Sequence, residues 1–191
     1  MGTNLQIGIE QNMMSNEKTL KIPRYCILVV DDEEAVRKLV VTLLSQRGHQ
    51  CFQAVDGADA LSKAVTNKFD AVITDIVMPK MSGITLTKEL IKMTPKLPIM
   101  VITGHDNEFS SVTAVAAGAK EFIKKPFSLT EFALRFQKMM NDYELFLQIE
   151  AKQKEMLFNI QKRSVEEITD LKREIESLKN RLYAGYPRFN R

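Results

Sequence analysis

Apolar runs and amphipathic stretches alternate along the chain from Tyr25 onwards. The first run, Tyr25–Val30, is uninterrupted and rich in β-branched residues, which is typical of a parallel strand buried on both faces. Glu33–Arg47 then repeats apolar residues at helical spacing, and Gly48 follows as a C-cap. The alternation continues with strands at Gln50–Ala54, Ala71–Thr74, Ile99–Ile102 and Glu121–Ile123, and with helices at Gly57–Asn67, Gly83–Met93, Asn107–Ala117 and from Ser128. This order predicts an α/β fold with a doubly wound, five-stranded parallel sheet.

The C-terminal part of the chain has a different pattern. From Phe132 to Tyr183 it contains neither Pro nor Gly, which predicts roughly 50 residues of helix, or about 75 Å. Five apolar residues follow the 3-4-3-4 spacing of a coiled coil: Ile168, Leu171, Ile175, Leu178 and Leu182. An apolar stripe upstream joins this register only with a slip near Ser164. One small domain cannot bury so long a stripe, so we expect a homodimer through this helix; a single solvated helix or a disordered tail is the alternative.

The predicted organisation therefore has four parts. Residues 1–23 form a polar, flexible leader, 24–137 the α/β domain, 138–183 the coiled-coil helix and 184–191 a short basic-aromatic tail. The leader lacks the pattern of a secretory signal, and no apolar stretch reaches the ~18 residues of a membrane span. We therefore expect a cytoplasmic protein without membrane contact.

The amino-acid composition excludes several classes of protein. Of 191 residues, 45% are hydrophobic and 27% charged, which excludes wholesale disorder and collagen-like fibres. The net charge of +3 is too small to argue for direct nucleic-acid binding. Cys26 and Cys51 lie in apolar runs and are expected to be buried thiols, and His49 is expected to be a surface turn residue.

Polar residues with chemical potential follow the predicted strands. Asp31 and Asp32 follow the first strand and Asp75 the third, whereas Thr103 and Lys125 follow the fourth and fifth. One acidic residue at such a place is usually a helix N-cap, but the carboxyl ends of parallel strands converge. Three carboxylates there suit Mg²⁺, and Asp75 can act as a nucleophile that becomes an aspartyl phosphate. Lys125 and Thr103 would contact the phosphoryl oxygens.

Four motifs resemble the receiver domain of bacterial two-component response regulators. They are Val29-Val-Asp-Asp-Glu33, Asp75-Ile-Val-Met-Pro79 with Gly83, Thr103-Gly104, and Lys125-Pro-Phe127. The resemblance implies a flavodoxin-like sheet of order 2-1-3-4-5 and Asp75 as the phosphoacceptor. It further implies a Mg²⁺ site made of Asp31, Asp32, Asp75 and the Val77 carbonyl, Lys125 as the phosphoryl contact, Thr103 and Phe122 as switch residues, and a cis bond before Pro126.

The resemblance also implies partners and a mode of action. A sensor histidine kinase or phosphotransfer protein would donate the phosphoryl group, and the chain would be a switch that assists its own phosphorylation and dephosphorylation rather than an enzyme. The face formed by Asn107–Ala117, the fifth strand and the last helix would report the state to partners. Phe122 is equally compatible with a plain core position. Val77 and His105 flank the expected path of an attacking water, unless His105 is an ordinary loop residue.

The sequence also bears on three alternative functional classes. The acidic run Asp31–Glu34 replaces the Gly-rich turn of a nicotinamide-dependent oxidoreductase, which excludes that class. A phosphatase of the haloacid dehalogenase type would need Asp-x-Asp after the first strand, where this chain has adjacent Asp residues. The remaining alternative is a receiver fragment of a larger regulator with a missing DNA-binding or enzymatic output domain, since residues 138–191 show no helix-turn-helix.

Overall fold

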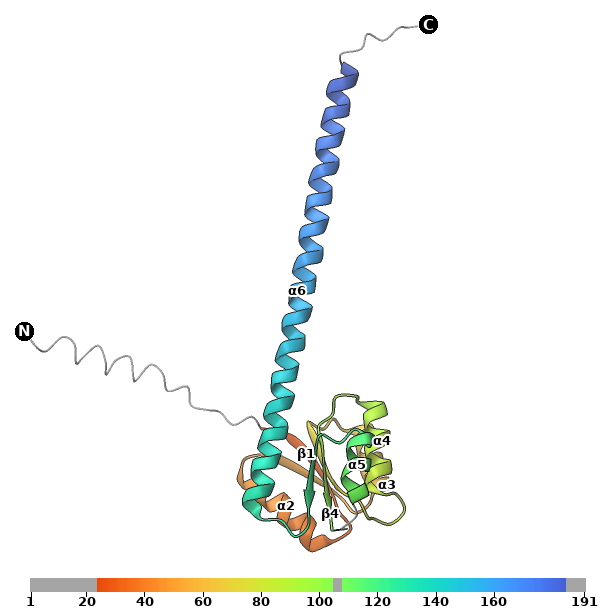
Figure 1. Cartoon of the computed structure of the whole chain (residues 1–191), viewed down its shortest axis with the longest axis vertical. Helices are drawn as coiled ribbons and strands as arrows, with labels where there is room; N and C mark the ends of the chain where they lie inside the picture. Colours follow the sequence, from red (N-terminus) through yellow and green to blue (C-terminus); the bar gives the residue numbers. More distant parts are fainter. Residues whose placement is uncertain (1–23, 105–107, 185–191) are drawn as a thin grey trace, which may run out of the picture. The chain divides into compact units, whose positions relative to one another are not determined.

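The computed structural model describes residues 24–104 and 108–184 (Figure 1). The predicted leader, residues 1–23, and all but the first residue of the predicted tail, 184–191, lie outside this range. The chain divides into two compact units between Met140 and Asn141. The first unit is the α/β domain with the beginning of the last helix, and the second is the remainder of that helix.

The first unit contains the predicted parallel sheet, in the order β2-β1-β3-β4-β5. Its strands are β1 (Cys26–Val30), β2 (Gln50–Ala54), β3 (Ala71–Asp75), β4 (Ile99–Thr103) and β5 (Glu121–Lys124). The helices are α2 (Glu34–Gln46), α3 (Gly57–Thr66), α4 (Gly83–Met93), α5 (Glu108–Ala117) and α6 (Leu129–Ala184). The α/β class and the strand order are confirmed. The sequence pattern located every strand to within one residue at each end.

Two layers of helices cover the sheet. One core cluster joins the β strands to α3, α4 and α5, through Ala60, Leu86, Leu90 and Ala114. Side chains of α2 and of the first three turns of α6 are also buried, among them Leu44 and Phe132, and Figure 1 shows these two helices on the other face. Because both faces are covered, β3 and β4 are buried at every position.

The last helix, α6, is continuous over 56 residues. The Ser128 hydroxyl accepts a hydrogen bond from the Glu131 N–H at 3.0 Å, which is the predicted cap. Phe132, Phe136, Met139 and Met140 are buried in the first unit. Beyond them the large apolar side chains of α6 are exposed. The long helix is therefore confirmed, and the coiled coil stays a prediction. No helix among the described residues is long and apolar enough to cross a membrane.

The structure corrects two expectations about burial. Cys26 and Cys51 are only half-buried, because Cys26 is the first residue of β1 and Cys51 lies on the edge strand β2. His49 is not a surface turn residue, because its side chain is only 5% exposed. Its ring stacks on Tyr25 at 5.2 Å and meets the edge of Phe136 at 5.6 Å, so the first turns of α6 cover the α2–β2 turn.

We predict that His49 makes the fold sensitive to acid. Burial lowers the pKa of this imidazole, the Arg47 charge acts in the same direction, and Nδ1 accepts a hydrogen bond from the Tyr25 N–H at 3.4 Å. The unfolded chain therefore takes up the proton first, and stability is lost as the pH falls below about 6.5. Between pH 7.5 and pH 5.5, about one unit on either side of that value, thermal unfolding should show a smaller loss of Tm in His49→Phe than in wild type. An equal loss in both proteins would contradict this role.

Candidate functional site

Two aspartates meet at the carboxyl edge of the sheet. Asp31 follows β1 and Asp75 ends β3, and these strands are neighbours. Asp31 is 2% and Asp75 6% exposed. The Asp31 carboxylate accepts a hydrogen bond from the Glu33 N–H at 2.9 Å, and Asp75 accepts one from the Val77 N–H at 2.9 Å. Each carboxylate is thus oriented by the first turn of the loop that follows it.

A single ammonium group bridges the two aspartates. Lys125 Nζ lies 3.0 Å from Asp31 Oδ2 and 3.3 Å from Asp75 Oδ1. It also lies 3.3 Å from Glu33 Oε1. The backbone N–H of Lys125 donates to the Thr103 carbonyl at 2.6 Å, and the Lys125–Pro126 bond is cis. The loop after β5 is therefore fastened to the end of β4.

The charges at this edge shift one another's protonation. Burial raises the pKa of the Asp75 carboxyl above its usual range; Lys125 opposes this and Asp31 reinforces it. Burial lowers the pKa of Lys125, but the hydrogen bond to Asp31 and the charges of Asp75 and Asp31 outweigh burial, so its pKa is raised. Lys125 is thus a fixed cation beside a carboxylate whose negative charge is costly. An electrophile bonded to Asp75 would relieve that cost.

The loop from β3 to α4 approaches Asp75 closely. The Gly83 N–H donates to the Ile76 carbonyl at 2.9 Å, and a Cβ at Gly83 would overlap the Asp75 carbonyl oxygen. The same loop carries Lys80, whose Nζ pairs with Asp56 at 2.6 Å. Val77 is 51% exposed, which leaves solvent access next to Asp75.

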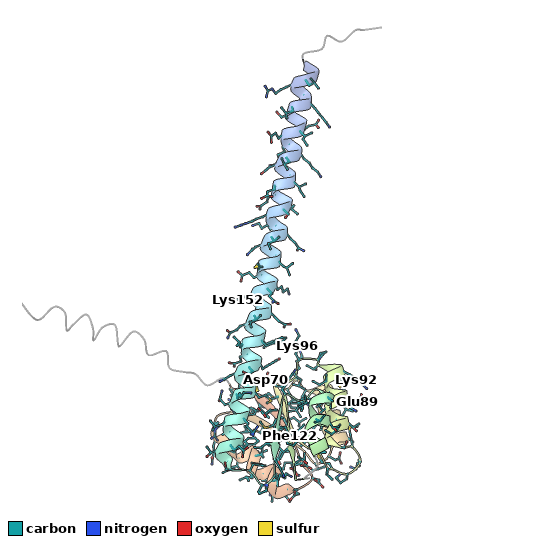
Figure 2. All side chains as sticks on the ribbon, in the orientation of Figure 1. Asp70, Glu89, Lys92, Lys96, Phe122 and Lys152 are labelled. Atoms are coloured by element: carbon teal, nitrogen blue, oxygen red, sulfur yellow. The ribbon has the colours of Figure 1, made fainter. Side chains whose placement is uncertain are left out.

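The other residues expected at the site do not take part in the ion pairs between Lys125 and the two aspartates. Asp32 is exposed at the start of the loop after β1. Thr103 ends β4 and is 1% exposed. Phe122 (labelled in Figure 2) is half-buried on β5 and packs against the core cluster that includes α3, α4 and α5. The structure therefore brings Asp31, Asp75 and Lys125 together and leaves Asp32 outside their hydrogen bonds. His105 lies outside the described residues.

The donor set can be compared with what Mg²⁺ requires. Within the described ranges, no three His, Cys, Asp or Glu side chains are placed so that they could hold an ion together. Two buried carboxylates at one edge, Asp31 and Asp75, still offer hard oxygen donors. Mg²⁺ commonly takes one or two protein carboxylates and keeps several waters. The chemistry of this donor set therefore fits Mg²⁺, with Asp32 contributing only if its exposed side chain turns inward.

Two supporting residues were missed by the sequence reasoning. Arg37 is buried on α2 and donates from Nη1 to the Asp31 carbonyl at 2.6 Å and from Nε to Gln53 at 3.3 Å. A charged residue between Val36 and Val40 on the apolar face of a helix was the available signal. Glu33 pairs with Lys125 across 92 positions of sequence, and nothing in a pattern of residues indicates that contact.

We predict that substitution by alanine strongly destabilises the domain at Gly83 and is tolerated at Gly104. Gly83→Ala should destabilise the domain by more than about 3 kcal/mol, because the new methyl group has no space beside the Asp75 carbonyl. Gly104→Ala meets nothing closer than 3.9 Å and should change stability by less than about 1 kcal/mol. Urea denaturation of both variants measures this difference. Equal tolerance at the two positions would contradict the close packing of this loop.

We predict opposite effects of the two charged neighbours on Asp75. Lys125→Met should raise the pKa of the Asp75 carboxyl, because a charge that lowers it is lost. Asp31→Asn should lower that pKa, because a charge that raises it is lost. Carbon-13 NMR titration of the aspartate carboxyl carbons measures both. Lys92→Met, which removes a lysine paired with Glu89 on α4 (Figure 2), is the matched control and should leave the Asp75 titration unchanged.

Comparison with known proteins identifies the domain. The family model described as "Response regulator receiver domain" matches residues 27–137, more than half of the chain. The chain is 37% identical over 119 residues to the alkaline phosphatase synthesis transcriptional regulatory protein PhoP of Bacillus subtilis, covering 62% of this chain and 50% of that protein. It is 37% identical over 114 residues to the response regulator MprA of Mycobacterium sp. strain KMS, covering 60% and 50%. The chain thus spans about half the length of these curated relatives.

Solved structures agree with this result. The receiver domain of NtrX from Brucella abortus matches with a TM-score of 0.58 and 36% identity, covering 60% of this chain and 98% of that one. A CheY-like receiver domain protein from Methanospirillum hungatei matches with a TM-score of 0.61 and 25% identity, covering 64% and 98%. The chain belongs to the response regulator receiver domain family.

Proposed function

We propose that the chain is a phosphorylation-dependent switch in which Asp75 is the phosphoacceptor. The observation that carries this proposal is the placement of Asp75 at the carboxyl end of β3, with Lys125 Nζ 3.3 Å from one carboxylate oxygen and the half-exposed Val77 beside it. A buried nucleophile needs both a cation for the incoming phosphoryl oxygens and a route to solvent. As a receiver, the domain is a switch module rather than an enzyme, and its donor would be a sensor histidine kinase or a phosphotransfer protein.

The chain's own residues account for most of the chemistry. A carboxylate oxygen of Asp75 would attack phosphorus, forming an O–P bond as the P–N bond of a phosphohistidine breaks, and the leaving imidazole keeps the electron pair. Lys125 would exchange part of its ion pair with Asp75 for the phosphoryl oxygens. Mg²⁺ held by Asp31, Asp32, Asp75 and the Val77 carbonyl would supply further neutralisation of charge.

The response to phosphorylation would begin at β4 and β5. Aspartyl phosphate carries about one to two negative charges and three acceptor oxygens, which attract the Thr103 hydroxyl and Lys125. Thr103 and Phe122 lie on neighbouring strands, and Val101 pairs with Phe122 in the sheet register. Movement of Thr103 would vacate space that the half-buried Phe122 can enter. The exposed residues Val112 and Val115 on α5 lie on the expected reporting face.

The output would pass through a homodimer formed by the distal part of α6. In support, the five residues with coiled-coil spacing are each more than half exposed within the described chain. Burial of such a stripe requires another helix.

The second candidate function is that of a receiver fragment whose missing output domain binds DNA. It is favoured by the coverage of about half of relatives such as PhoP, which is described as a transcriptional regulatory protein.

We predict stoichiometric labelling at Asp75. Incubation with Mg²⁺ and acetyl phosphate should add about 80 Da once per chain, as a labile adduct, and Asp75→Asn should abolish it. Intact-mass spectrometry measures the adduct. Asp70→Asn is the matched control, because Asp70 lies at the other end of β3 and its amide oxygen can still accept the Cys26 N–H. An unlabelled wild type, or turnover of an external phosphate ester as in a phosphatase, would refute the proposal.

A further inference from the structure

We propose that the distal part of α6 pairs with a second copy of this chain as a parallel, in-register, two-stranded coiled coil. The inference rests on the proposed homodimer and adds its orientation and register. It concerns the segment from Ser164 to Leu182, which is helical throughout. Figure 2 shows side chains standing out along α6. The seam residues of this segment are each more than half exposed: Ile168, Leu171, Ile175, Leu178 and Leu182.

The identities of the seam residues favour two parallel strands. With Ile168 at heptad position a, Ile175 also falls at a, and Leu171 and Leu178 fall at d. β-branched Ile at a combined with Leu at d is the arrangement that favours parallel dimers over trimers and tetramers. Leu182 completes the next a position. Side-chain shape therefore favours two strands, and the direction is argued from the charges beside the seam.

Charges beside the seam give an independent argument. The first two g positions are acidic, Glu167 and Glu174, and the e positions that they face, Lys172 and Lys179, are basic; the third g position is Arg181, whose facing e position lies beyond this segment. In a parallel dimer, each g residue faces the next e residue of the other copy, so every one of these contacts pairs Glu with Lys. In an antiparallel dimer, g faces g and e faces e. Those contacts would place Lys beside Lys on the e side, and Glu beside Glu or Arg181 on the g side, so an antiparallel dimer gains fewer opposite-charge contacts.

The same charges specify the register. In register, the two flanks of the dimer contain four Glu–Lys contacts, namely Glu167 with Lys172 and Glu174 with Lys179 on each side. A shift of one heptad keeps only two of them, since Glu174 of one copy then has no e residue opposite it within residues 164–182, and Glu167 of the other copy faces Val165. The shift also leaves part of the apolar seam uncovered. The in-register pairing satisfies both requirements at once.

Ion pairs within the helix leave these flanking groups available. Arg173 pairs with Asp170 at 2.9 Å, and both residues occupy the outer positions f and c. Lys162 reaches Glu166 only at 4.0 Å, again on outer positions. Lys179 lies 3.9 Å from Glu176, a weak contact that a closer partner can replace. Within the described part of the chain, the structure gives no ion pair to Glu167, Lys172 or Glu174.

Disulfide trapping tests the direction. Leu171→Cys and Leu178→Cys, each in the full chain, place one thiol at successive d positions about 10 Å apart. In a parallel, in-register dimer each cysteine meets its own counterpart, so both variants should form an interchain disulfide under mild oxidation. The wild-type chain, with Cys26 and Cys51, is the control, and mass spectrometry of the cross-linked peptides identifies the bond. An antiparallel dimer has one dyad and can cross-link at one of these positions at most.

Charge exchange tests the same inference without altering the seam. Lys172→Glu with Lys179→Glu turns all four contacts into Glu–Glu pairs and should weaken the dimer about tenfold or more. Adding Glu167→Lys and Glu174→Lys to that variant restores opposite charges and should restore wild-type affinity. Sedimentation equilibrium measures both. In an antiparallel dimer Lys172 and Lys179 face one another, so the first change would exchange one like-charge contact for another and would not weaken the dimer in this way.

The outcomes test the relative direction of the two helices separately from the existence of the dimer. A dimer by light scattering that cross-links at both cysteines and follows the charge pattern supports the inference. A dimer that cross-links at one position or none, or is indifferent to the charge changes, overturns the parallel arrangement and leaves the proposed dimer standing. A chain that stays monomeric at high concentration overturns the dimer as well. Labelling at Asp75 is independent of all three outcomes.

Discussion

Three charged groups at one edge of the sheet constrain the rest of the domain. Asp31 and Asp75 bring two carboxylates almost out of solvent, and Lys125 Nζ lies within 3.3 Å of both. Burying either carboxylate without that ammonium would be costly, and burying the ammonium without them would be equally so. The parallel sheet makes the arrangement possible, because the strand order puts β1 beside β3 and brings the loop after β5 back across the end of β4.

This constraint explains several local features that are otherwise unrelated. Arg37 is buried on an apolar helix face because it holds the Asp31 carbonyl. Gly83 has no side chain because the loop that follows Asp75 folds back onto its carbonyl oxygen. The raised pKa of Asp75 comes first from burial and then from the balance between Lys125 and Asp31. The first two features fix the backbone of Asp31 and Asp75, and the third makes the negative charge of Asp75 costly.

The sequence predicted much of this and missed part of it for physical reasons. Periodicity located the strands, and the convergence of parallel strand ends predicted that Asp31, Asp75 and Lys125 lie at one edge of the sheet. Periodicity identifies the face on which a residue lies and not its neighbours. The Glu33–Lys125 pair, the Arg37 anchor and the burial of His49 under α6 were therefore beyond its reach. Likewise, an a/d stripe specifies a long helix but not what covers it.

A short chain of contacts leads from the charged edge to the long helix. Lys125 follows β5, and β5 carries Glu121 and Phe122. Arg135 on α6 donates to the Glu121 carboxylate at 3.1 Å and to the Phe122 carbonyl at 3.3 Å. The strand that leads into Lys125 is therefore held by the first turns of α6, through one side chain and one backbone carbonyl. The same turns bury Phe132 and Phe136, and Phe136 meets the rings of Tyr25 and His49. Since α6 continues unbroken to Ala184, the helix that holds β5 through Arg135 is the same helix that carries the exposed apolar stripe.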